Sequence, residues 1–358
     1  MVTGAGIGYR PKLAAALVRR PGRIDFLEVV AESCRDAAVR REVVALSRVW
    51  PVVLHSIGVS PGSAEGVERA RVDWLAGLAR ELGARLVSEH MAFVRAGGRE
   101  IGHLTELPRT RSAVAVLARN VATIRRRLPD IPFLLENPAR AFVWPHHEMN
   151  EATFLHEVTM ATGCPLLLDV ANLHANAQNG EATSLDELPL DRVALVHVAG
   201  GSLEGGHHHD THAHPVAEEV FALAARTGAP LLLERDDALD DPEPLLAEVD
   251  RLRTLAGARN VAMLPTMALV EDVSLAPAQR ELARLLLNDE PAPRLDVARN
   301  ILKRKQRAHE RPVRSLAVEH GTGSVFSRLL RRALRGRDRD CPHHLESALF
   351  AENAATGR

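Results

Sequence analysis

The sequence is poor in aromatic residues and carries almost no net charge. Aromatic side chains make up 3% of the 358 residues, whereas hydrophobic residues make up 46% and charged residues 25%. This composition is typical of a folded chain with an aliphatic core and excludes a largely disordered one. The net charge of −1 provides no general attraction to nucleic acid or to an acidic membrane, so we expect neither as a partner.

Long apolar runs are also absent. No stretch approaches the roughly 20 consecutive apolar residues that a membrane span requires, and the N-terminal segment MVTGAGIGYRPK lacks the apolar core of a signal peptide. We therefore expect a cytoplasmic protein. The three cysteines, Cys34, Cys164 and Cys341, show no CxxC spacing, and they predict neither a zinc knuckle nor a disulfide framework.

Histidine, in contrast, is concentrated in one segment. Five of the 17 histidines lie in HHHDTHAH, residues 207–214. The segment is in the middle of the chain and precedes helix-forming sequence, which argues against an affinity tag. It is either a loose metal-binding loop or one part of a built metal site. Its first three histidines follow two glycines, and we expect them to be mobile.

Short apolar runs alternate with longer helical stretches over residues 1–258. The eight runs are GIGYR (6–10), IDFLEVV (24–30), VVLHS (52–56), RLVSEH (85–90), PFLLEN (132–137), PLLLDV (165–170), ALVHVAG (194–200) and PLLLERD (230–236). This alternation predicts βα units around a parallel sheet, and eight units in about 250 residues are typical of a (β/α)8 TIM barrel. The alternative, a doubly wound open sheet, is disfavoured because no GxGxxG motif follows the first run.

Seven of the eight runs end in a residue that can ionise or bind a metal. These residues are Glu28, His55, Glu89 with His90, Glu136 with Asn137, Asp169, His197 and Glu234. In a TIM barrel the catalytic groups project from the carboxyl ends of the strands. Buried carboxylates and imidazoles are costly unless they are paired or bind a cation. A ring of them at one rim therefore predicts bound metal ions.

The kinds of donor narrow the choice of metal. Imidazole and carboxylate without thiolate suit Fe(II), Mn(II) or Zn(II) at a reactive site. The candidates are too many for one ion, so we expect two or three. The loop after the sixth run, DVANLHANAQN, adds Asn172 and His174, and the histidine-rich segment adds Asp210 and His212.

Nine segments in a fixed order give the chain a family resemblance. They are GIGYRP, FLEVVAES, LHSIGVSPGS, SEHMAF, LLENPA, LLLDVANLHANAQN, VHVAGG, DTHAHPV and LLLERDD, within residues 6–240. The sequence resembles the DUF692 family of multinuclear non-haem iron-dependent oxidases, which includes the methanobactin-biosynthesis oxidase and the 3-thiaglutamate-pathway enzyme. The resemblance implies a xylose-isomerase-like TIM barrel, in agreement with the strand count.

The resemblance also implies ligands and a chemistry. It implies two or three iron ions, with O2 as co-substrate, acting on cysteine residues of a ribosomally synthesised precursor peptide. The implied metal ligands are His55, His90, Glu136, Asp169, Asn172, His174, His197, Asp210, His212 and Glu234. Glu89, Glu32 and His214 are expected beside the ligands, where they would orient them. The family commonly has polar residues at the positions of Ala171 and Gly201, and this departure leaves the peptide and its product undefined.

Two other classes of function stay open at this point. One is a divalent-metal hydrolase or isomerase on the same barrel, similar to endonuclease IV or to a sugar isomerase. The other is a metal-binding accessory protein without catalysis. The fold alone does not separate these classes, because one barrel hosts many chemistries.

Residues 259–358 lie beyond the eight βα units. We expect them to form a helical, basic and partly disordered extension to a barrel of residues 1–258. The segment SLAPAQRELARLLLNDEPAP (274–293) has helical periodicity, and RLLRRALRGRDRD further along is basic. We expect either this extension or a separate partner protein to recruit the peptide.

Overall fold

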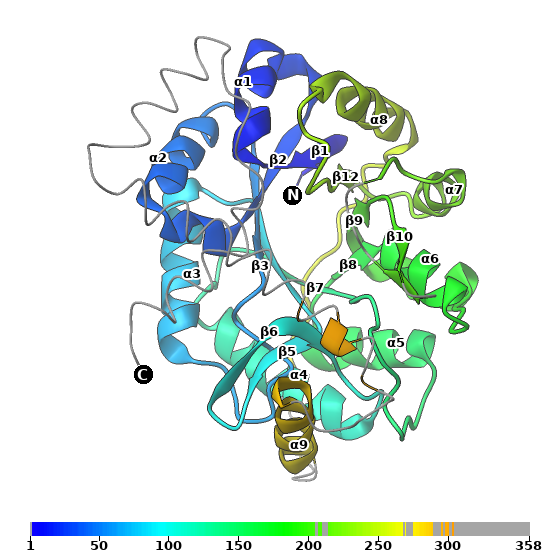
Figure 1. The fold of residues 1–358 in the computed structure, drawn as a ribbon. Helices are drawn as coiled ribbons and strands as arrows, with labels where there is room; N and C mark the ends of the chain where they lie inside the picture. Colours follow the sequence, from blue (N-terminus) through cyan, green and yellow to red (C-terminus); the bar gives the residue numbers. More distant parts are fainter. Residues whose placement is uncertain are drawn as a thin grey trace.

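The computed structural model describes residues 2–204, 207–209, 214–267, 269, 275–288, 295, 298–300 and 303. Eight parallel strands close into a barrel, which Figure 1 shows in a view along its axis. In order around the barrel the strands are β1 (Ala5–Gly8), β2 (Phe26–Val30), β3 (Val52–Ser56), β4 (Leu86–His90), β7 (Phe133–Glu136), β8 (Leu166–Asp169), β9 (Val193–Val198) and β12 (Leu231–Leu233). The predicted TIM barrel is confirmed, and every strand falls within one of the eight apolar runs or within one residue of it.

In the part of the chain that the structure describes, eight helices surround the barrel. They are α1 (Pro11–Arg19), α2 (Ala37–Leu46), α3 (Arg69–Leu82), α4 (Arg111–Arg125), α5 (Glu151–Thr162), α6 (Val170–Gln178), α7 (Glu218–Ala225) and α8 (Pro242–Leu255). Short 3-10 turns lie at Pro21–Arg23, Ala31–Arg35, Leu185–Glu187 and Leu190–Arg192. The side chains of Asp36, Thr110 and Asn150 accept hydrogen bonds from the first turns of α2, α4 and α5, which stabilises the start of each helix.

The segment after β8 is a helix and not the expected loop. α6 begins directly after the strand because the Asp169 side chain accepts a hydrogen bond from Asn172 N and so caps the helix. An aspartate cap stabilises a helix start by about 1 kcal/mol. The strand end and the helix start therefore share one residue, which sets Asn172 and His174 on the first turns of α6.

A layer of apolar side chains fills the barrel interior. Seven strands contribute to it, with Phe26, Val53, Leu86, Leu134, Leu167, Leu232 and, from β9, Ala194 and Leu195. The eighth strand contributes Gly6, where an added Cβ would lie 2.4 Å from the Phe26 ring. Glycine is needed there because the aromatic ring occupies the space of its side chain. A second, larger core lies between the barrel and the helices.

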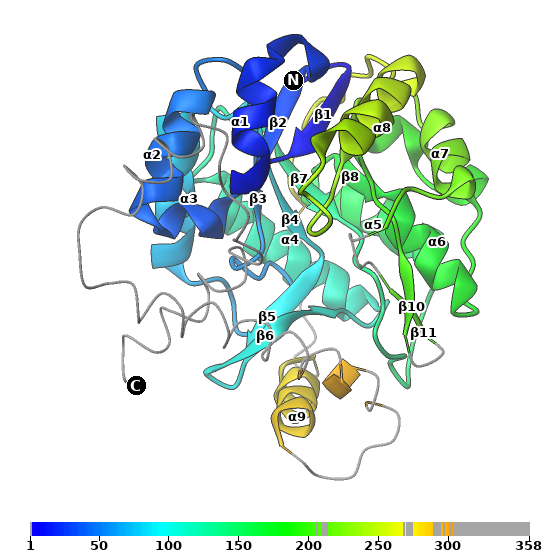
Figure 2. The same cartoon turned by 45° about the horizontal axis from the view of Figure 1, so that its top comes forward.

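Two hairpins interrupt the βα alternation, and the sequence analysis missed both. β5 (Ala92–Ala96) pairs antiparallel with β6 (Arg99–Glu106), and β10 (Ser202–Glu204) pairs antiparallel with β11 (His207–His209). Figure 2 shows both hairpins on the same side of the barrel. Residues 207–209, expected to be a mobile loop tip, form the paired strand β11, and the His208 backbone exchanges two hydrogen bonds with the Asn179 side chain.

The segment after α8 contacts the rest of the protein near the amino end of β8 and again at the β5–β6 hairpin. Leu264 N donates to Gly163 O near the start of β8. Further along, α9 (Leu275–Leu287) packs against the β5–β6 hairpin. The buried Gln279 side chain holds α9 there, accepting from Ala64 N at 2.8 Å and donating to Gly62 O at 2.7 Å. None of the described helices is long and apolar enough to cross a membrane.

Candidate metal centre

The polar strand-end residues form a layer directly above the apolar floor of the barrel. On six strands the polar residue lies two positions after the floor residue, as Glu28 follows Phe26 and His55 follows Val53. Because side chains alternate along a strand, residues two apart face the same side. The same periodicity that fills the barrel therefore directs these imidazoles and carboxylates into its mouth.

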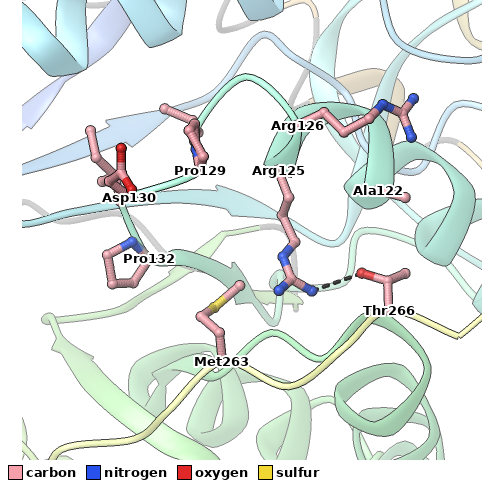
Figure 3. Close-up of a pocket in the computed structure, with 10 residues that line it drawn as sticks. Ala122, Arg125, Arg126, Pro129, Asp130, Pro132, Met263 and Thr266 are labelled. Carbon is pink, nitrogen blue, oxygen red and sulfur yellow. Dashed lines mark hydrogen bonds between the residues drawn. The ribbon is translucent and has the colours of Figure 1, made fainter.

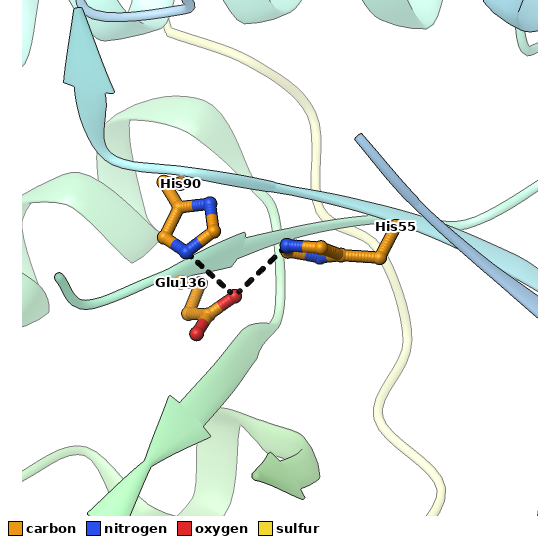
Figure 4. Close-up of side chains that lie close together, drawn as sticks. All are labelled: His55, His90 and Glu136. Carbon is orange, nitrogen blue, oxygen red and sulfur yellow. Dashed lines mark ion pairs between the residues drawn. The ribbon is translucent and has the colours of Figure 1, made fainter. Parts of the chain in front are cut away.

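The first donor group comprises His55, His90 and Glu136, from β3, β4 and β7. One carboxylate oxygen, Glu136 Oε2, lies 3.6 Å from His55 Nε2 and 3.5 Å from His90 Nε2 (Figure 4). All three side chains are buried. Two atoms bound to one ion at about 2.1 Å, with angles of about 90–110°, would lie about 3.0–3.4 Å apart. The observed separations are close to this range and need only small side-chain movements.

The second donor group surrounds His197 on β9. His197 Nδ1 lies 3.4 Å from Glu136 Oε1 and 3.3 Å from Glu234 Oε2. His197 belongs to two overlapping sets of donors. One set contains Glu136 and Asp169, and the other contains Glu28 and Glu234. Glu136 thus presents Oε2 to the first group and Oε1 to the second. The described donors can hold two ions with Glu136 bridging them.

Several buried polar atoms of this cluster have no hydrogen-bond partner. They are His90 Nδ1, His197 Nδ1, Glu136 Oε2 and Asn172 Oδ1. Leaving such an atom without a partner costs about 1–3 kcal/mol, and buried orphan groups are uncommon in native proteins. Two divalent cations would satisfy Glu136 Oε2 and His197 Nδ1 and would also neutralise the four buried carboxylates of the donor groups. The donor set therefore fits metal ions.

The pKa values of the imidazoles reflect this environment. Burial lowers the pKa of His55. Burial acts in the same direction on His90, but the carboxylates of Glu136 and Glu89 outweigh it and raise the pKa to about 9. The pKa of His197 is also raised well above its ordinary value, because Glu234 and other carboxylates outweigh burial. Without metal, protons occupy ring nitrogens that a metal would take.

The carboxylates divide into two kinds. Burial raises the pKa of Asp169 to about 7, and the neighbouring charge of Glu136 adds to this effect. Burial would also raise the pKa of Glu136, but His90 and His197 outweigh it and lower the pKa. The bridging carboxylate is therefore kept ionised by its imidazoles, which is the form that binds metal.

Behind the first donor group lies a pair of buried carboxylates joined by a serine. The Ser56 hydroxyl lies 2.9 Å from Glu32 Oε1 and 3.0 Å from Glu89 Oε2. Burial, together with the charge of Glu89, raises the pKa of Glu32 to about 7. Glu89 Oε1 lies 3.6 Å from His90 Nδ1. Glu89 therefore lies beside His90, and Ser56 links Glu89 to Glu32.

The remaining predicted residues are placed as follows. Asn172 is buried and donates from Nδ2 to Asn137 O, which leaves Oδ1 available. His174 lies on α6, half-buried, and belongs to none of the donor groups found among the described residues. His214 is exposed. Asp210 and His212 lie outside the described residues.

Two residues of the site were absent from the predicted set. Glu28 is the middle residue of β2 and contacts His197; the sequence analysis named it among the polar residues near the run ends but not among the ligands. Arg10, at the end of β1, is buried and donates to Asp236 from Nε at 3.0 Å. Its charge acts on Glu234 and Glu28. No sequence pattern marked Arg10 as part of the site.

The described cysteines are not candidates for ligands. Cys34 and Cys164 are free and buried, and burial raises the pKa of each thiol to about 12. Both stay protonated at neutral pH, whereas a metal or an electrophile reacts with the thiolate. Within the described part of the chain, the centre is built from nitrogen and oxygen donors only.

A separate cavity of about 470 Å³ lies near the amino end of β7, on the side of the barrel away from the metal centre. It is lined by the end of α4, by the segment before β7 and by Met263 and Thr266 (Figure 3). Arg125 crosses it and donates to Thr266 Oγ1 at 2.7 Å. Because Pro132 precedes the first residue of β7, the cavity is remote from the carboxyl ends of the strands and from the metal centre.

Most of the chain matches one known protein family. The family described as RiPP precursor modification enzyme MbnB/TglH/ChrH, where RiPP denotes a ribosomally synthesised and post-translationally modified peptide, matches residues 4–257. The chain belongs to the MbnB/TglH/ChrH family. The resemblance inferred from the nine sequence segments is thereby confirmed.

Relatives in this family share the barrel region. A UPF0276 protein of Streptomyces avermitilis is 44% identical over 266 residues, covering 70% of this chain and 54% of the relative. This chain therefore spans about half the length of that relative. A UPF0276 protein of Caulobacter vibrioides is 36% identical over 270 residues, covering 72% of this chain and 96% of the relative.

Solved structures of other proteins are similar over about 70% of this chain. D-psicose 3-epimerase from Clostridium cellulolyticum is 10% identical with a TM-score of 0.48, covering 71% of this chain and 100% of that one. Endonuclease IV from Thermus thermophilus is 17% identical with a TM-score of 0.45, covering 70% of this chain and 98% of that one.

Proposed function

We propose that this MbnB/TglH/ChrH family member is a multinuclear, non-haem iron oxidase that uses O2 to modify cysteine residues of a ribosomally synthesised precursor peptide. The observation that carries the proposal is the Glu136-bridged pair of buried donor groups at the barrel mouth. Two positions sharing one carboxylate place two reactants within a few ångströms of each other, which is the geometry that favours a reaction between them.

Iron is the proposed metal because of the donor set and the reaction. Imidazole and carboxylate donors without a thiolate suit a reactive Fe(II) site. When bound, iron would supply the electrons for O2 chemistry and would bind a substrate thiolate at an open coordination position. The thiolate would come from the substrate, since burial keeps Cys34 and Cys164 protonated.

The chain's own residues would hold the ligands in place and limit the access of water. The apolar layer below the centre seals the barrel interior. On the β7 side, Phe142 and Trp144 are buried together, with ring centroids 5.6 Å apart. Trp144 Nε1 donates to Glu106 O at the end of the β5–β6 hairpin. A dry, rigid setting strengthens electrostatic interactions at the centre.

Asn172, His174, Asp210 and His212 are proposed as further ligands, which would hold a third ion or complete the second. Asn172 Oδ1 is a buried acceptor without a hydrogen-bond partner, as a ligand oxygen would be before metal binds. His174 lies on the same helix. The proposed ligand set is thus the set expected from the resemblance, with four residues, Asn172, His174, Asp210 and His212, outside the described donor groups.

We propose that the extension of residues 259–358, or a separate partner protein, recruits the peptide to the barrel of residues 1–258. α9 packs against the β5–β6 hairpin, and β5 begins two residues after His90. The extension therefore reaches the hairpin that borders the first donor group. We also place the protein in the cytoplasm, where precursor peptides are synthesised, with no nucleic-acid or membrane partner.

Anaerobic purification followed by metal analysis and Mössbauer spectroscopy tests the proposal. Spectra are recorded with and without a cysteine-containing precursor peptide, before and after O2 is added. We expect two or three irons per chain, a change in the iron signal when the peptide binds, and O2-dependent loss of the cysteine. Full occupancy by zinc, with turnover that is independent of O2, would contradict the proposal and would favour a hydrolase or isomerase.

A further inference from the structure

His197 is contacted by carboxylates through both ring nitrogens, at clearly different distances. Nε2 lies 2.8 Å from Glu28 Oε2, whereas Nδ1 lies 3.3 Å from Glu234 Oε2 and 3.4 Å from Glu136 Oε1. The short contact is a hydrogen bond, and Nδ1 makes none. The distance of 2.8 Å is typical of a charge-assisted N–H···O bond.

The hydrogen bond decides which proton the ring keeps when a metal binds. A carboxylate only accepts hydrogen bonds, so Nε2 donates to Glu28. Nδ1 has no such partner, so it is the nitrogen that gives up its proton and offers a lone pair to the metal. Nδ1 is the atom that faces Glu136 and Glu234. One imidazole can therefore serve one ion, and the two overlapping donor groups that contain His197 reduce to a single metal position.

The role of Glu28 has two possible readings, because it lies close enough to His197 and Glu234 to share an ion with them. Two ligand atoms on one ion at about 2.1 Å would be at least about 3.0 Å apart, and the Glu28–His197 contact at 2.8 Å is shorter. Coordination by Glu28 and Nε2 would also leave the Nδ1 proton between two carboxylates at hydrogen-bond distances that are too long. The contact favours a hydrogen-bonded pair over a pair of ligands.

The rings of His55 and His90 are oriented alike, with a hydrogen bond behind His55 and a longer contact of 3.6 Å behind His90. His55 Nδ1 lies 2.9 Å from Ser88 Oγ, and its Nε2 faces Glu136. His90 Nδ1 faces Glu89 and its Nε2 faces Glu136. Each ring therefore has one nitrogen toward the donor group and the other toward a supporting side chain, as is usual for histidines that bind metals.

We propose that Glu28 is a positioning residue and not a metal ligand: it holds the Nε2 proton of His197 and directs Nδ1 to the metal position between Glu136 and Glu234. Arg10, whose charge acts on Glu28 and Glu234, supports the carboxylate from the end of β1. This inference rests on the metal centre of the proposed function, but not on iron or on the oxidase reaction.

The test uses Co²⁺ as the probe metal in the full-length protein after the native metal is removed. Binding stoichiometry and affinity are measured by competition with a chelator for wild type, Glu28→Gln and Glu28→Leu. Proton NMR of the Co²⁺ form detects the solvent-exchangeable N–H protons of bound histidines, whose signals are displaced by the metal. Glu106→Gln is the matched control, since Glu106 is a buried carboxylate outside the donor groups.

We expect both Glu28 variants to keep the wild-type number of Co²⁺ ions, with about 10–100-fold weaker binding at one position. One exchangeable N–H signal should shift in Glu28→Gln and broaden in Glu28→Leu, while the signals of the other histidines stay in place. If Glu28→Leu does not fold, the N–H signal of the isosteric Glu28→Gln decides the outcome.

Two results would overturn the inference. Loss of one whole ion in Glu28→Leu, together with a changed Co²⁺ visible spectrum in Glu28→Gln, would make Glu28 a ligand. Unchanged affinity and an unchanged N–H signal in Glu28→Gln would leave it without a role. A failure of the proposed function can be distinguished from these two results. In that case wild type and the Glu28 variants would bind Co²⁺ as expected above, but the iron-loaded protein would not consume O2 with a cysteine peptide.

Discussion

Replacing Glu136 with glutamine should weaken both metal positions at once. Glu136 Oε2 faces His55 and His90, and Oε1 faces His197. Glutamine keeps the shape of the side chain but turns one oxygen into an N–H donor and removes the charge. The one remaining oxygen of the glutamine can face only one of the two metal positions, and it is neutral. The other metal position loses its oxygen ligand from residue 136.

The size of the effect follows from His90. Burial opposes its protonation, yet the carboxylates, with Glu136 first among them, raise its pKa from 6.5 to about 9. That difference corresponds to at most about 3 kcal/mol for one positive charge, at 1.36 kcal/mol per pKa unit. A divalent ion interacts with the same carboxylate at least as strongly. We therefore expect metal binding at the His55–His90 position to weaken about 100-fold.

Chelator competition with Fe²⁺ or Co²⁺ under anaerobic conditions measures this effect, and Asp169→Asn is the comparison. Asparagine also caps helices, so α6 should keep its start, and Asp169 belongs only to the His197 group. We expect Asp169→Asn to weaken one position and Glu136→Gln to weaken two. If Glu136→Gln affected no more than one position, the bridging arrangement would be wrong.

Three further predictions test other parts of the molecule. His212→Ala should lower the iron content, as inductively coupled plasma mass spectrometry would detect; normal iron and activity would exclude His212 as a ligand. Burial raises the pKa of Glu106 to about 7, so its contribution to stability is full below about pH 4.5 and is lost as the pH rises through 7. Denaturant titrations should show Glu106→Gln gaining up to about 3 kcal/mol over wild type between pH 4 and pH 8, and an equal difference at both pH values would contradict this. Gln279→Leu leaves Ala64 N and Gly62 O without their partner, at a cost of about 1–3 kcal/mol each. Hydrogen exchange in 275–287 should therefore accelerate, and the KM for a precursor peptide should rise, whereas the exposed Glu281→Gln should change neither. Unchanged hydrogen exchange in Gln279→Leu would mean that apolar contacts alone hold α9.

The strands and most of the helices could be predicted because their signals are local. Each strand is a short apolar run with a defined end, and α5, for example, begins after the capping Asn150 and ends at Gly163 in the left-handed conformation. The β5–β6 hairpin was missed because β5 begins two residues after β4 ends, so its apolar residues read as a continuation of the same run. α6 was taken for a loop because its cap, Asp169, also had the appearance of a strand end.

The candidate ligands could be predicted as a set, but their grouping could not. A residue such as Glu136 can be recognised from its position at the end of an apolar run. Its shared position between two groups depends on the order of β3, β4, β7, β8 and β9 around the closed barrel, with β7 in the middle. The same holds for Arg10, whose Asp236 partner is 226 positions away in the chain.

The sequence by itself determined the number of βα units, the polar residues at their ends and the family to which the chain belongs, because each of these depends on patterns within a few residues. Only the tertiary structure decided which nitrogen of His197 faces the metal position and which carboxylate holds the other nitrogen. Those assignments depend on distances between strands that are far apart in the chain, such as the 2.8 Å from His197 to Glu28. Closure of the barrel creates these distances, and the local pattern of residues does not contain them.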